Sequence, residues 1–448
     1  MTKKYGTALF VVATIYASTF VHAQFGGVVD PGVRGGPPGA GGPLDGLTPS
    51  QQDYFQKTQA TFEEVLPVTS GVGPRMNMDN CTSCHSQPAT GGTSPAVNPE
   101  IAFAQQGADH IPSFLSADGP AREVRFVRNP DGSPDGGVHD LFTITGRSGA
   151  DGCQLAQPDF EREAARHNVS FRIPTPVFGM GLIEMIPDGA IRDQATADLG
   201  LKRAFGIRGH ENHRTEERVS GQINAGQDGT VTRFGWKAQN KSAHVFAAEA
   251  LNVELGMTTE MFQTEREEDG RCQFTSVPND LTNTDAGAPF DLMTRLERIA
   301  MFMRFLAPPA PSPDTPGGAD SISRGSTLFD QTGCVLCHRR SYTTDAAGVL
   351  AMQHKTVELF SDLLVHDMGV GLADGVTQGA AGPQEFRTAP LWGLGQRIFF
   401  LHDGRTTNLV QAIRAHASEG SEANGVIARF DRLDAGQKQD LLNFLRSR

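Results

Sequence analysis

Two copies of one five-residue pattern place cysteine and histidine side chains where they could hold a redox cofactor. The pattern C-x-x-C-H occurs as Cys81-Thr82-Ser83-Cys84-His85 and as Cys334-Val335-Leu336-Cys337-His338. It is typical of c-type haem attachment, in which two thiols bond the porphyrin and the histidine ligates the iron. The spacing suits this chemistry because residues three and four apart share one face of a helical turn. The sequence therefore predicts two covalently bound haem c groups, with His85 and His338 as proximal ligands.

The two remaining cysteines, Cys153 and Cys272, lie outside these motifs. In an oxidising compartment they could pair as a disulfide, and two unpaired thiols are the alternative.

The N-terminal residues predict export of the chain. Lys3 and Lys4 precede an apolar run, residues 8–21, and residues 1–23 are typical of a cleaved secretory signal peptide. The run is too short to span a membrane, and no later stretch is apolar enough to do so. Export followed by covalent haem attachment predicts a periplasmic protein with no membrane span in the mature chain.

The formal net charge of −12 argues against nucleic acid or an anionic membrane as a partner. It favours an encounter with a positively charged patch on a redox protein.

Composition divides the rest of the chain into four parts. Residues 24–47 are rich in Gly and Pro and predict a flexible tether, and residues 307–319, APPAPSPDTPGGA, predict an extended linker. The linker separates a first domain, residues 48–306, from a second domain, residues 320–448. We expect a mainly α fold with two cytochrome c-like helical domains, each holding one haem, and with long loops and short β-hairpins in the first.

Three helices are predicted from capping and apolar spacing. Residues 49–66 follow the N-cap Thr48, residues 291–306 carry apolar side chains at helical spacing, and Asp434 with Gln437 forms a capping box before the last helix. The inward-facing side chains expected in the first two are Phe55, Phe62, Val65, Leu292, Leu296, Ile299, Met303 and Leu306.

A weak internal repeat supports two related halves. Residues 176–181, PVFGMG, parallel residues 390–395, PLWGLG.

Further segments resemble the bacterial di-haem oxidoreductases, a family described as peroxidases or thiol oxidoreductases and related to di-haem cytochrome c peroxidases and MauG-type enzymes. The segments are GVGPRMN at 71–77, GMGLIEMIPDG at 179–189, RFGWKAQ at 233–239, ELGMT at 254–258, HDMGVGLADG at 366–375, and RTAPLWGLG with FLHDGR between 387 and 405. The resemblance implies two facing haem domains that pass electrons to an oxidant. A thiol oxidase activity is disfavoured, because haem attachment leaves no C-x-x-C dithiol.

The sixth iron ligands decide which haem can bind a substrate, because an iron with two protein ligands transfers electrons and an open one binds peroxide or oxygen. For the second haem we favour His416, fourteen residues after His402, the spacing at which the related peroxidases place their distal ligand. Met368 is the alternative. In the first half the equivalent position lies near Glu254, a poor iron ligand, so we expect the first haem to keep the open site.

Peroxide cleavage also needs a group that moves a proton. Glu184 lies in an otherwise apolar run and is the first candidate, because burial would raise its pKa; a salt-bridged glutamate at a turn is the alternative. Glu254 is the second candidate. Trp236 could relay electrons between the haems, or could simply pack at a haem edge.

Other residues could bind the porphyrin itself. Arg387, Arg397 and Arg405 could pair with haem propionates, although surface ion pairs are the alternative, and Trp392 could pack at a haem edge.

The sequence thus predicts a periplasmic di-haem oxidoreductase that reduces hydrogen peroxide at the first haem. Electrons would come from a small cytochrome c or cupredoxin through the second haem. Peroxide-dependent oxidation of a protein or organic substrate, as by MauG-type enzymes, a pure electron-transfer cytochrome and a scaffold with structural haem are the alternatives. The related peroxidases also suggest a calcium ion between the domains, although no acidic loop here has calcium-ligand spacing.

Overall fold

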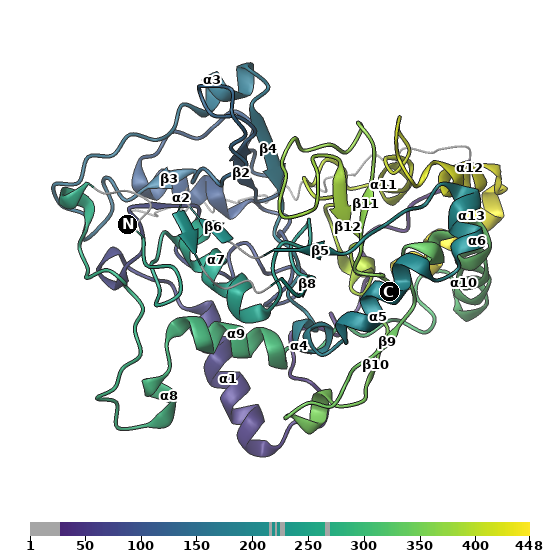
Figure 1. Ribbon diagram of the computed structural model, residues 1–448, viewed down its shortest axis with the longest axis horizontal. Helices are drawn as coiled ribbons and strands as arrows, with labels where there is room; N and C mark the ends of the chain where they lie inside the picture. The colour runs from purple at the N-terminus through teal and green to yellow at the C-terminus, as the bar shows by residue number, and fades with distance from the viewer. Residues whose placement is uncertain (1–26, 215–216, 220–221, 225–228, 265–268) are drawn as a thin grey trace, which may run out of the picture.

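The computed structural model describes residues 27–214, 217–219, 222–224, 229–264 and 269–448 (Figure 1). The predicted signal peptide, residues 1–23, lies outside the described residues. Helices make up most of the regular structure, which confirms the mainly α fold class. The α-helices are α1 (Pro49–Glu63), α2 (Pro99–Gly107), α3 (Phe160–Ala165), α4 (Met180–Glu184), α5 (Asp188–Thr196), α6 (Leu199–Phe205), α7 (Ala243–Leu255), α8 (Pro289–Leu292), α9 (Arg295–Phe305), α10 (Ala319–Thr332), α11 (Leu409–Arg414), α12 (Asn424–Arg432) and α13 (Ala435–Ser447).

The strands of the described chain form small antiparallel pairs rather than one continuous sheet. The pairs are β1 (Arg75–Met76) with β3 (Phe142–Thr143), β2 (Glu123–Phe126) with β4 (Val169–Arg172), β5 (Asn212–His213) with β8 (Val231–Thr232), β6 (Glu217–Val219) with β7 (Gln222–Asn224), β9 (Tyr342–Thr343) with β10 (Thr356–Val357), and β11 (Val365–Asp367) with β12 (Glu385–Arg387). Four of these pairs lie in the first half, where the sequence predicts short hairpins.

Each half is built around packed helices. In the first half α9 packs against α1 and α7, and the ring of Phe302 lies 5.4 Å from that of Phe55 and 4.7 Å from that of Phe62. In the second half α10 packs against α13. Gly325 permits this close approach, because a Cβ there would lie 2.0 Å from the carbonyl oxygen of Asp440.

The helix ends follow capping more closely than apolar spacing. Asp434 forms the predicted capping box, and Thr48 is the predicted N-cap and forms a capping box with Gln51. Helix α1 nevertheless ends at Glu63, and Val65 is 63% exposed rather than buried. The predicted helix over 291–306 is also wrong at its start. Thr294 forms a capping box with Glu297 and begins α9 there, so Leu292 belongs to the separate helix α8 and is exposed.

Each half also extends over the other. Helix α6 of the first half packs against α12, and Phe205 lies in an apolar cluster with Leu336 and Val426 (Figure 1). In the opposite direction Tyr342 and Val357, from the β9–β10 hairpin, are buried in the core of the first half. Each of the two regions that carry a haem motif therefore contributes side chains to the packing of the other.

The Gly/Pro-rich segment before α1 is not an unpacked tether, so this prediction is wrong over residues 27–47. Val28 is buried in the core of the second half, whereas Leu44 and Leu47 are buried in that of the first. Backbone hydrogen bonds join Gly39 to Ala310 and Gly42 to Ala307 of the linker. We call residues 28–47 the N-terminal strap, because they cross from one half to the other.

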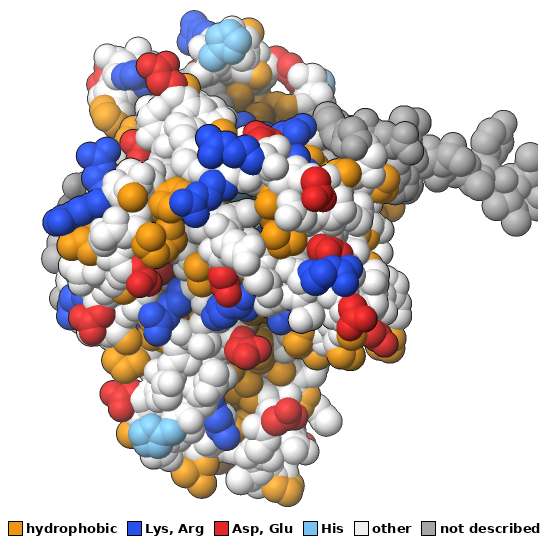
Figure 2. Space-filling view, turned by 90° about the vertical axis from the view of Figure 1, so that its right-hand side faces the viewer, with side chains coloured by type: hydrophobic (Ala, Val, Ile, Leu, Met, Phe, Trp, Pro, Cys, Tyr) orange, Lys and Arg blue, Asp and Glu red, His pale blue; other side chains and the backbone are white. Residues whose placement is uncertain are grey.

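Cys153 and Cys272 form a disulfide, which confirms the predicted pairing. No helix of the described chain is long and apolar enough to cross a membrane. Figure 2 shows the face over the second half, where basic and acidic side chains are interspersed.

Candidate functional site

Both C-x-x-C-H motifs fold into one helical turn. The amide of His85 donates to the carbonyl of Cys81 (3.0 Å), and the amide of His338 donates to that of Cys334 (2.9 Å). None of the four motif cysteines is in a disulfide. Each motif therefore presents two thiols and an imidazole on one turn, as covalent haem attachment requires.

The orientation of both motif histidines suits iron ligation. Nδ1 of His85 lies 2.9 Å from the carbonyl oxygen of Gly92, and Nδ1 of His338 lies 3.0 Å from that of Phe360. A protonated Nδ1 that donates to a carbonyl leaves Nε2 as the ligand atom. Burial lowers the pKa of each imidazole to about 4, so both are neutral, the form that binds a metal. These residues fit a c-type haem in each half.

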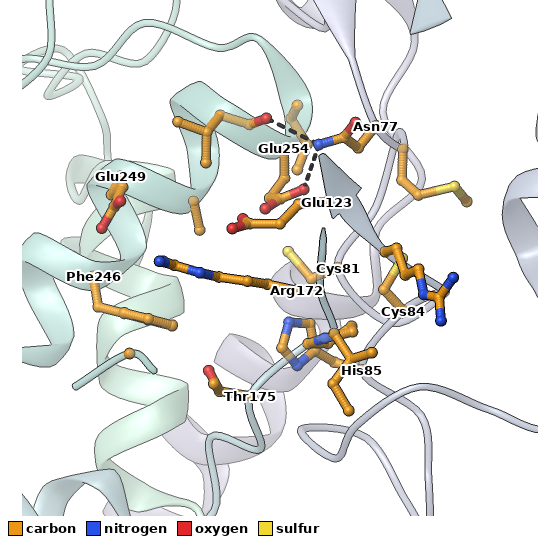
Figure 3. A pocket seen from close by; sticks show the side chains of 18 of the residues that line it. Asn77, Cys81, Cys84, His85, Glu123, Arg172, Thr175, Phe246, Glu249 and Glu254 are labelled. Carbon is orange, nitrogen blue, oxygen red and sulfur yellow. Dashed lines mark hydrogen bonds between the residues drawn. The ribbon is translucent and has the colours of Figure 1, made fainter. Parts of the chain in front are cut away.

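The first motif opens into a cavity of about 910 Å³, the first cavity, whose walls carry many charges (Figure 3). Cys81, Cys84 and His85 line it. Its ionisable side chains are Glu100, Glu123, Glu249, Glu254, Arg122, Arg125 and Arg172. Burial raises the pKa of Glu100 to about 8, so this carboxyl is protonated at neutral pH.

Two of these carboxyls, Glu123 and Glu254, lie side by side (Figure 3). Glu254, at the end of α7, accepts a hydrogen bond from Asn77 Nδ2 (2.9 Å). Burial and the nearby Glu123 raise its pKa well above the usual range. The structure thus brings Glu254, but not its sequence neighbour Met257, to the wall of the first cavity.

The pKa of Glu123 is shifted in the opposite direction. Burial alone would raise its pKa, but Arg125, 2.6 Å away, and Arg172 lower it below the usual range. Arg172 is the register partner of Glu123 across the β2–β4 pair, so strand pairing brings the two together. The pKa values of the two carboxyls are therefore shifted in opposite directions, the arrangement that suits a base and an acid.

Glu184 lies outside both motif cavities. It ends α4, and Arg304 of α9 donates to its carboxylate from Nε (2.6 Å) and from a terminal nitrogen (3.0 Å). The amide of Ala243 donates to it as well (2.9 Å). Glu184 is therefore salt-bridged, which is the alternative interpretation of this residue from the sequence. Its charge partner Arg304 lies on a helix far away in the chain, so local sequence does not reveal the pair.

The second motif opens into a larger cavity of about 1320 Å³, the second cavity, whose walls are mostly apolar. Cys334, Cys337 and His338 line it, and so do His416 and Met368. His416 follows α11, and its Nδ1 lies 2.8 Å from the carbonyl oxygen of Ala412, which leaves Nε2 free. Burial lowers the pKa of His416. His338 and His416 thus present two imidazoles to this cavity with similarly held rings.

Two buried arginines line the second cavity without a carboxylate partner among the described residues. Arg387 donates from Nε to the carbonyl of Gly235 (2.9 Å), and burial lowers the pKa of both Arg387 and Arg397 to about 10. Buried cations need an anion nearby, and haem propionates would supply it. Arg405 differs, because it pairs with Asp403 and the carbonyl of Gly371 away from the cavity.

Trp236 lies in the walls of both cavities. Its Nε1–H donates to the carbonyl of Ile173 (2.9 Å), which fixes the ring. Trp392 lies instead in a smaller space between them, which Trp236 also lines. There the two repeat segments touch, since a Cβ on Gly179 would lie 2.7 Å from the Trp392 ring.

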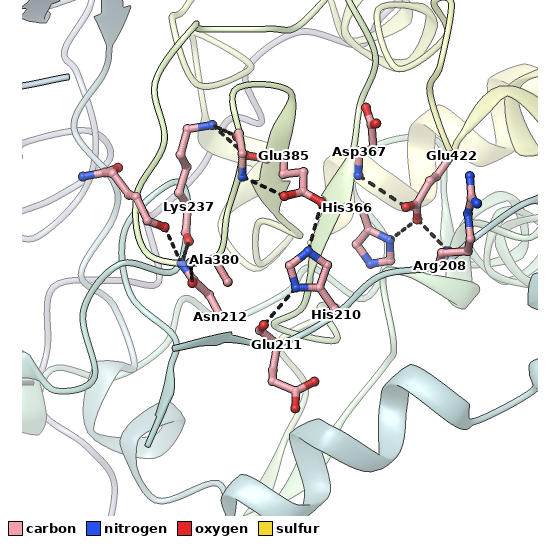
Figure 4. Close-up of polar contacts among 12 residues, drawn as sticks. Arg208, His210, Glu211, Asn212, Lys237, His366, Asp367, Ala380, Glu385 and Glu422 are labelled. Atoms are coloured by element: carbon pink, nitrogen blue, oxygen red, sulfur yellow. Dashed lines mark hydrogen bonds and ion pairs between the residues drawn. The ribbon is translucent and has the colours of Figure 1, made fainter. Parts of the chain in front are cut away.

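A buried ion network joins the two halves beside Trp236. Asp374 of the second half pairs with Arg172 (2.8 Å) and Lys237 (3.0 Å) of the first. Lys237 Nζ also donates to the carbonyls of Gly382 and Glu385, both at 2.8 Å (Figure 4). Asp374 and Lys237 both belong to segments that carry the family resemblance, but their pairing has no sequence signal.

A second network lies beside Cys337. His366 is buried between Asp362 (3.0 Å) and Glu422 (2.9 Å), and Figure 4 shows its contact with Glu422. Burial would lower its pKa, but Cys337 and Asp362 raise it well above the usual range. Cys337, Asp362 and His366 form the one group of potential metal ligands found in the described chain. It offers one carboxylate beside a thiol and an imidazole, whereas calcium takes about six to eight oxygen ligands, so the calcium ion stays a prediction.

A protein-family comparison gives the chain a family. The family "Di-haem oxidoreductase, putative peroxidase" matches residues 160–448, which include the second haem motif but not the first. No curated protein matches the chain. Among solved structures, hydrazine synthase of Kuenenia stuttgartiensis is 20% identical with a TM-score of 0.23, over 36% of this chain and 56% of that one. A MauG-like protein associated with microbial copper homeostasis is 22% identical with a TM-score of 0.26, over 36% and 55%. The matches thus span little more than half of each solved chain.

Proposed function

Because the chain belongs to the di-haem oxidoreductase family, we propose that it is a c-type enzyme that reduces hydrogen peroxide in the first cavity. Electrons would reach that cavity through the second haem. The observation that carries the proposal is the Glu123–Glu254 pair, which supplies both a base and an acid beside one haem motif.

The residues assigned to haem binding are those of the two motifs. Cys81 and Cys84, and likewise Cys334 and Cys337, would form the thioether bonds, with His85 and His338 on the iron. His416 would be the sixth ligand in the second cavity, whose buried Arg387 would face a propionate. A haem iron with a free coordination position binds peroxide and delivers electrons to the O–O bond.

The carboxyl pair would move the protons of this reaction. Reduction of H₂O₂ to two H₂O consumes two electrons and two protons. The Glu123 carboxylate is the group able to accept a proton from bound peroxide, and the Glu254 carboxyl is able to donate one to the departing oxygen. Arg125 and Arg172 hold Glu123 in the ionised form that this role needs.

Trp236 would connect the two cavities. Its N–H faces a backbone carbonyl rather than a base, so the indole would keep its proton if it takes part in electron transfer. The physiological donor would be a small cytochrome c or cupredoxin in the periplasm, in keeping with the export signal and the acidic net charge.

Electron paramagnetic resonance of the haem-loaded protein tests this proposal. We expect one haem with an open or labile site, a second low-spin haem, and peroxide consumption with a reduced small cytochrome. His416→Ala should convert only the low-spin haem, whereas the matched variant Met368→Leu should leave both signals unchanged. Two permanently low-spin haems without peroxide turnover would make the protein an electron-transfer cytochrome instead.

A further inference from the structure

The N-terminal strap reaches the segment that carries His416. Val28 is buried in the second core, and the backbone of Val29 exchanges two hydrogen bonds with the Gln439 side chain of α13 (3.0 and 2.9 Å). Arg34 donates to the carbonyls of Gly395 (2.6 Å), Ser447 (2.8 Å) and Ala310 (3.1 Å). The strap is therefore fixed on both sides of Asp30.

Asp30 is the one charged side chain of the strap that binds α11. Its carboxylate, 5% exposed, accepts both Nε and a terminal nitrogen of Arg446 (2.8 Å each). The same carboxylate accepts the amide of Leu409 (2.6 Å), the first residue of α11, and the amide of Gly32 (3.0 Å). Asp30 thus binds a backbone donor that a helix start leaves without an intrahelical partner.

Helix α11 transmits this contact to His416. The helix has only six residues and ends at Arg414, and His416 follows it, with Nδ1 on the carbonyl of Ala412. Leu409, Ala412 and His416 all line the second cavity. A shift of the Leu409 end would therefore move the imidazole, because a helix this short has few other hydrogen bonds to hold it.

The opposite end of this segment is held by residues of both halves. Ser421 Oγ donates to the carbonyl of His416 (2.5 Å), and Glu422 accepts from His366 (2.9 Å) and from the amide of Arg208 (2.8 Å). Arg446, besides binding Asp30, donates to the carbonyl of Arg397 (2.9 Å), whose side chain lines the same cavity. Asp30 therefore joins the strap to two parts of the cavity wall.

We propose that Asp30 is a positioning residue that holds α11 so that His416 stays on the second haem. The inference rests on the proposed function, which makes His416 the sixth ligand. Loss of the Asp30 carboxylate would increase the fraction of protein in which His416 has left the iron.

Cyanide binding to the haem-loaded protein measures that fraction, because an external ligand binds only the open form and its apparent affinity scales with the open population. We expect Asp30→Ala to bind cyanide at the second haem about tenfold more tightly than the wild type. The first haem should bind cyanide as before. Asp45→Ala, which removes an exposed strap carboxylate, is the matched control and should leave both haems unchanged.

Asp30→Asn separates positioning from the ion pair. The amide oxygen can still accept the Leu409 amide while the charge opposite Arg446 is lost, so its cyanide affinity should stay closer to that of the wild type. This variant also decides the matter if Asp30→Ala does not fold. An Asp30→Asn cyanide affinity above that of the wild type would then support the proposal, and an affinity equal to that of the wild type would overturn it.

His416→Ala distinguishes failure of this inference from failure of the proposed function. If His416→Ala opens the second haem to cyanide and a folded Asp30→Ala matches the wild type, the inference alone is wrong. If His416→Ala leaves the second haem unchanged, the ligand assignment fails and the inference fails with it. In the double variant, Asp30→Ala should add nothing to His416→Ala.

Discussion

The two motif cavities have different walls although their attachment turns are alike. In both, a histidine amide closes the turn and its Nδ1 lies against a backbone carbonyl. The first cavity then gathers carboxyls and guanidinium groups, whereas the second gathers mostly apolar side chains and three further imidazoles, those of His366, His402 and His416. The contrast supports the proposal that the two attachment sites serve different roles. Charged walls suit proton transfer, and apolar walls with a second ligand suit an iron that only exchanges electrons.

Glu254→Gln gives the largest expected effect on this comparison. Loss of the acid in the first cavity should lower peroxide turnover by roughly 10²–10⁴-fold, while the second haem keeps its spectrum. Steady-state peroxide consumption with a reduced cytochrome measures it. Glu184→Gln, which breaks the ion pair with Arg304 outside the cavity, is the control and should turn over near the wild-type rate; a large loss there would restore Glu184 as the acid.

Glu100→Gln should change the pH dependence of stability. The pKa of Glu100 is about 8 in the folded chain against 4.5 for an unperturbed group. Between these values the unfolded chain releases a proton that the folded chain keeps. The free energy of unfolding therefore falls as pH rises, by at most ~1.4 kcal/mol per pH unit.

Thermal unfolding of the haem-loaded protein between pH 5 and pH 8 checks this expectation, with roughly these limits set by the two pKa values. Glu100→Gln should flatten the slope and gain stability relative to the wild type at the upper end. Glu161→Gln, an exposed carboxyl, should keep the wild-type slope. An equal dependence of stability on pH in the wild type and in Glu100→Gln would show that the Glu100 carboxyl does not stay protonated in the folded chain.

Trp236→Phe tests the shared wall between the cavities. The smaller ring cannot donate to Ile173, so we expect electron transfer between the haems to slow by roughly tenfold, or ~1.4 kcal/mol in the barrier. Rapid mixing of half-reduced enzyme with peroxide measures this rate. Trp392→Phe, in the adjacent space, should slow this electron transfer less. A larger effect of Trp392→Phe would instead make Trp392 the residue that connects the two haems.

Arg387→Met concerns the second cavity alone. Removal of a buried positive charge stabilises the oxidised iron, so the midpoint potential of the second haem should fall by about 60 mV, equal to about tenfold in a one-electron equilibrium. Redox titration measures it. Arg405→Met is the control, because Arg405 already has Asp403 as a partner. The midpoint potential of the second haem in this variant should match that of the wild type.

Local patterns predict part of this molecule well. The haem-motif turns and the capping boxes at Thr48 and Asp434 depend on residues within one helical turn, and the sequence contains all that they need. The neighbourhood of His416 and His338 was predictable only through the family resemblance.

Long-range contacts explain what the sequence could not predict. Glu123 becomes a base candidate because β2 pairs with β4 and aligns it with Arg172. Glu184 forms an ion pair because Arg304, 120 residues away, reaches its carboxylate. The strap looks like a tether by composition, yet Asp30 is ordered by Arg446 from the other end of the chain. No local spacing contains these partners.

The position of Trp236 constrains how this protein could be redesigned. One indole forms part of both cavity walls. The hydrogen bond from its Nε1 to the carbonyl oxygen of Ile173 would be lost if the ring turned to another orientation. A substitution made here to admit a bulkier substrate on one side would also reshape the surroundings of the other iron. Substrate range and electron supply therefore cannot be engineered independently through this residue, and variants aimed at one should be selected with both measured.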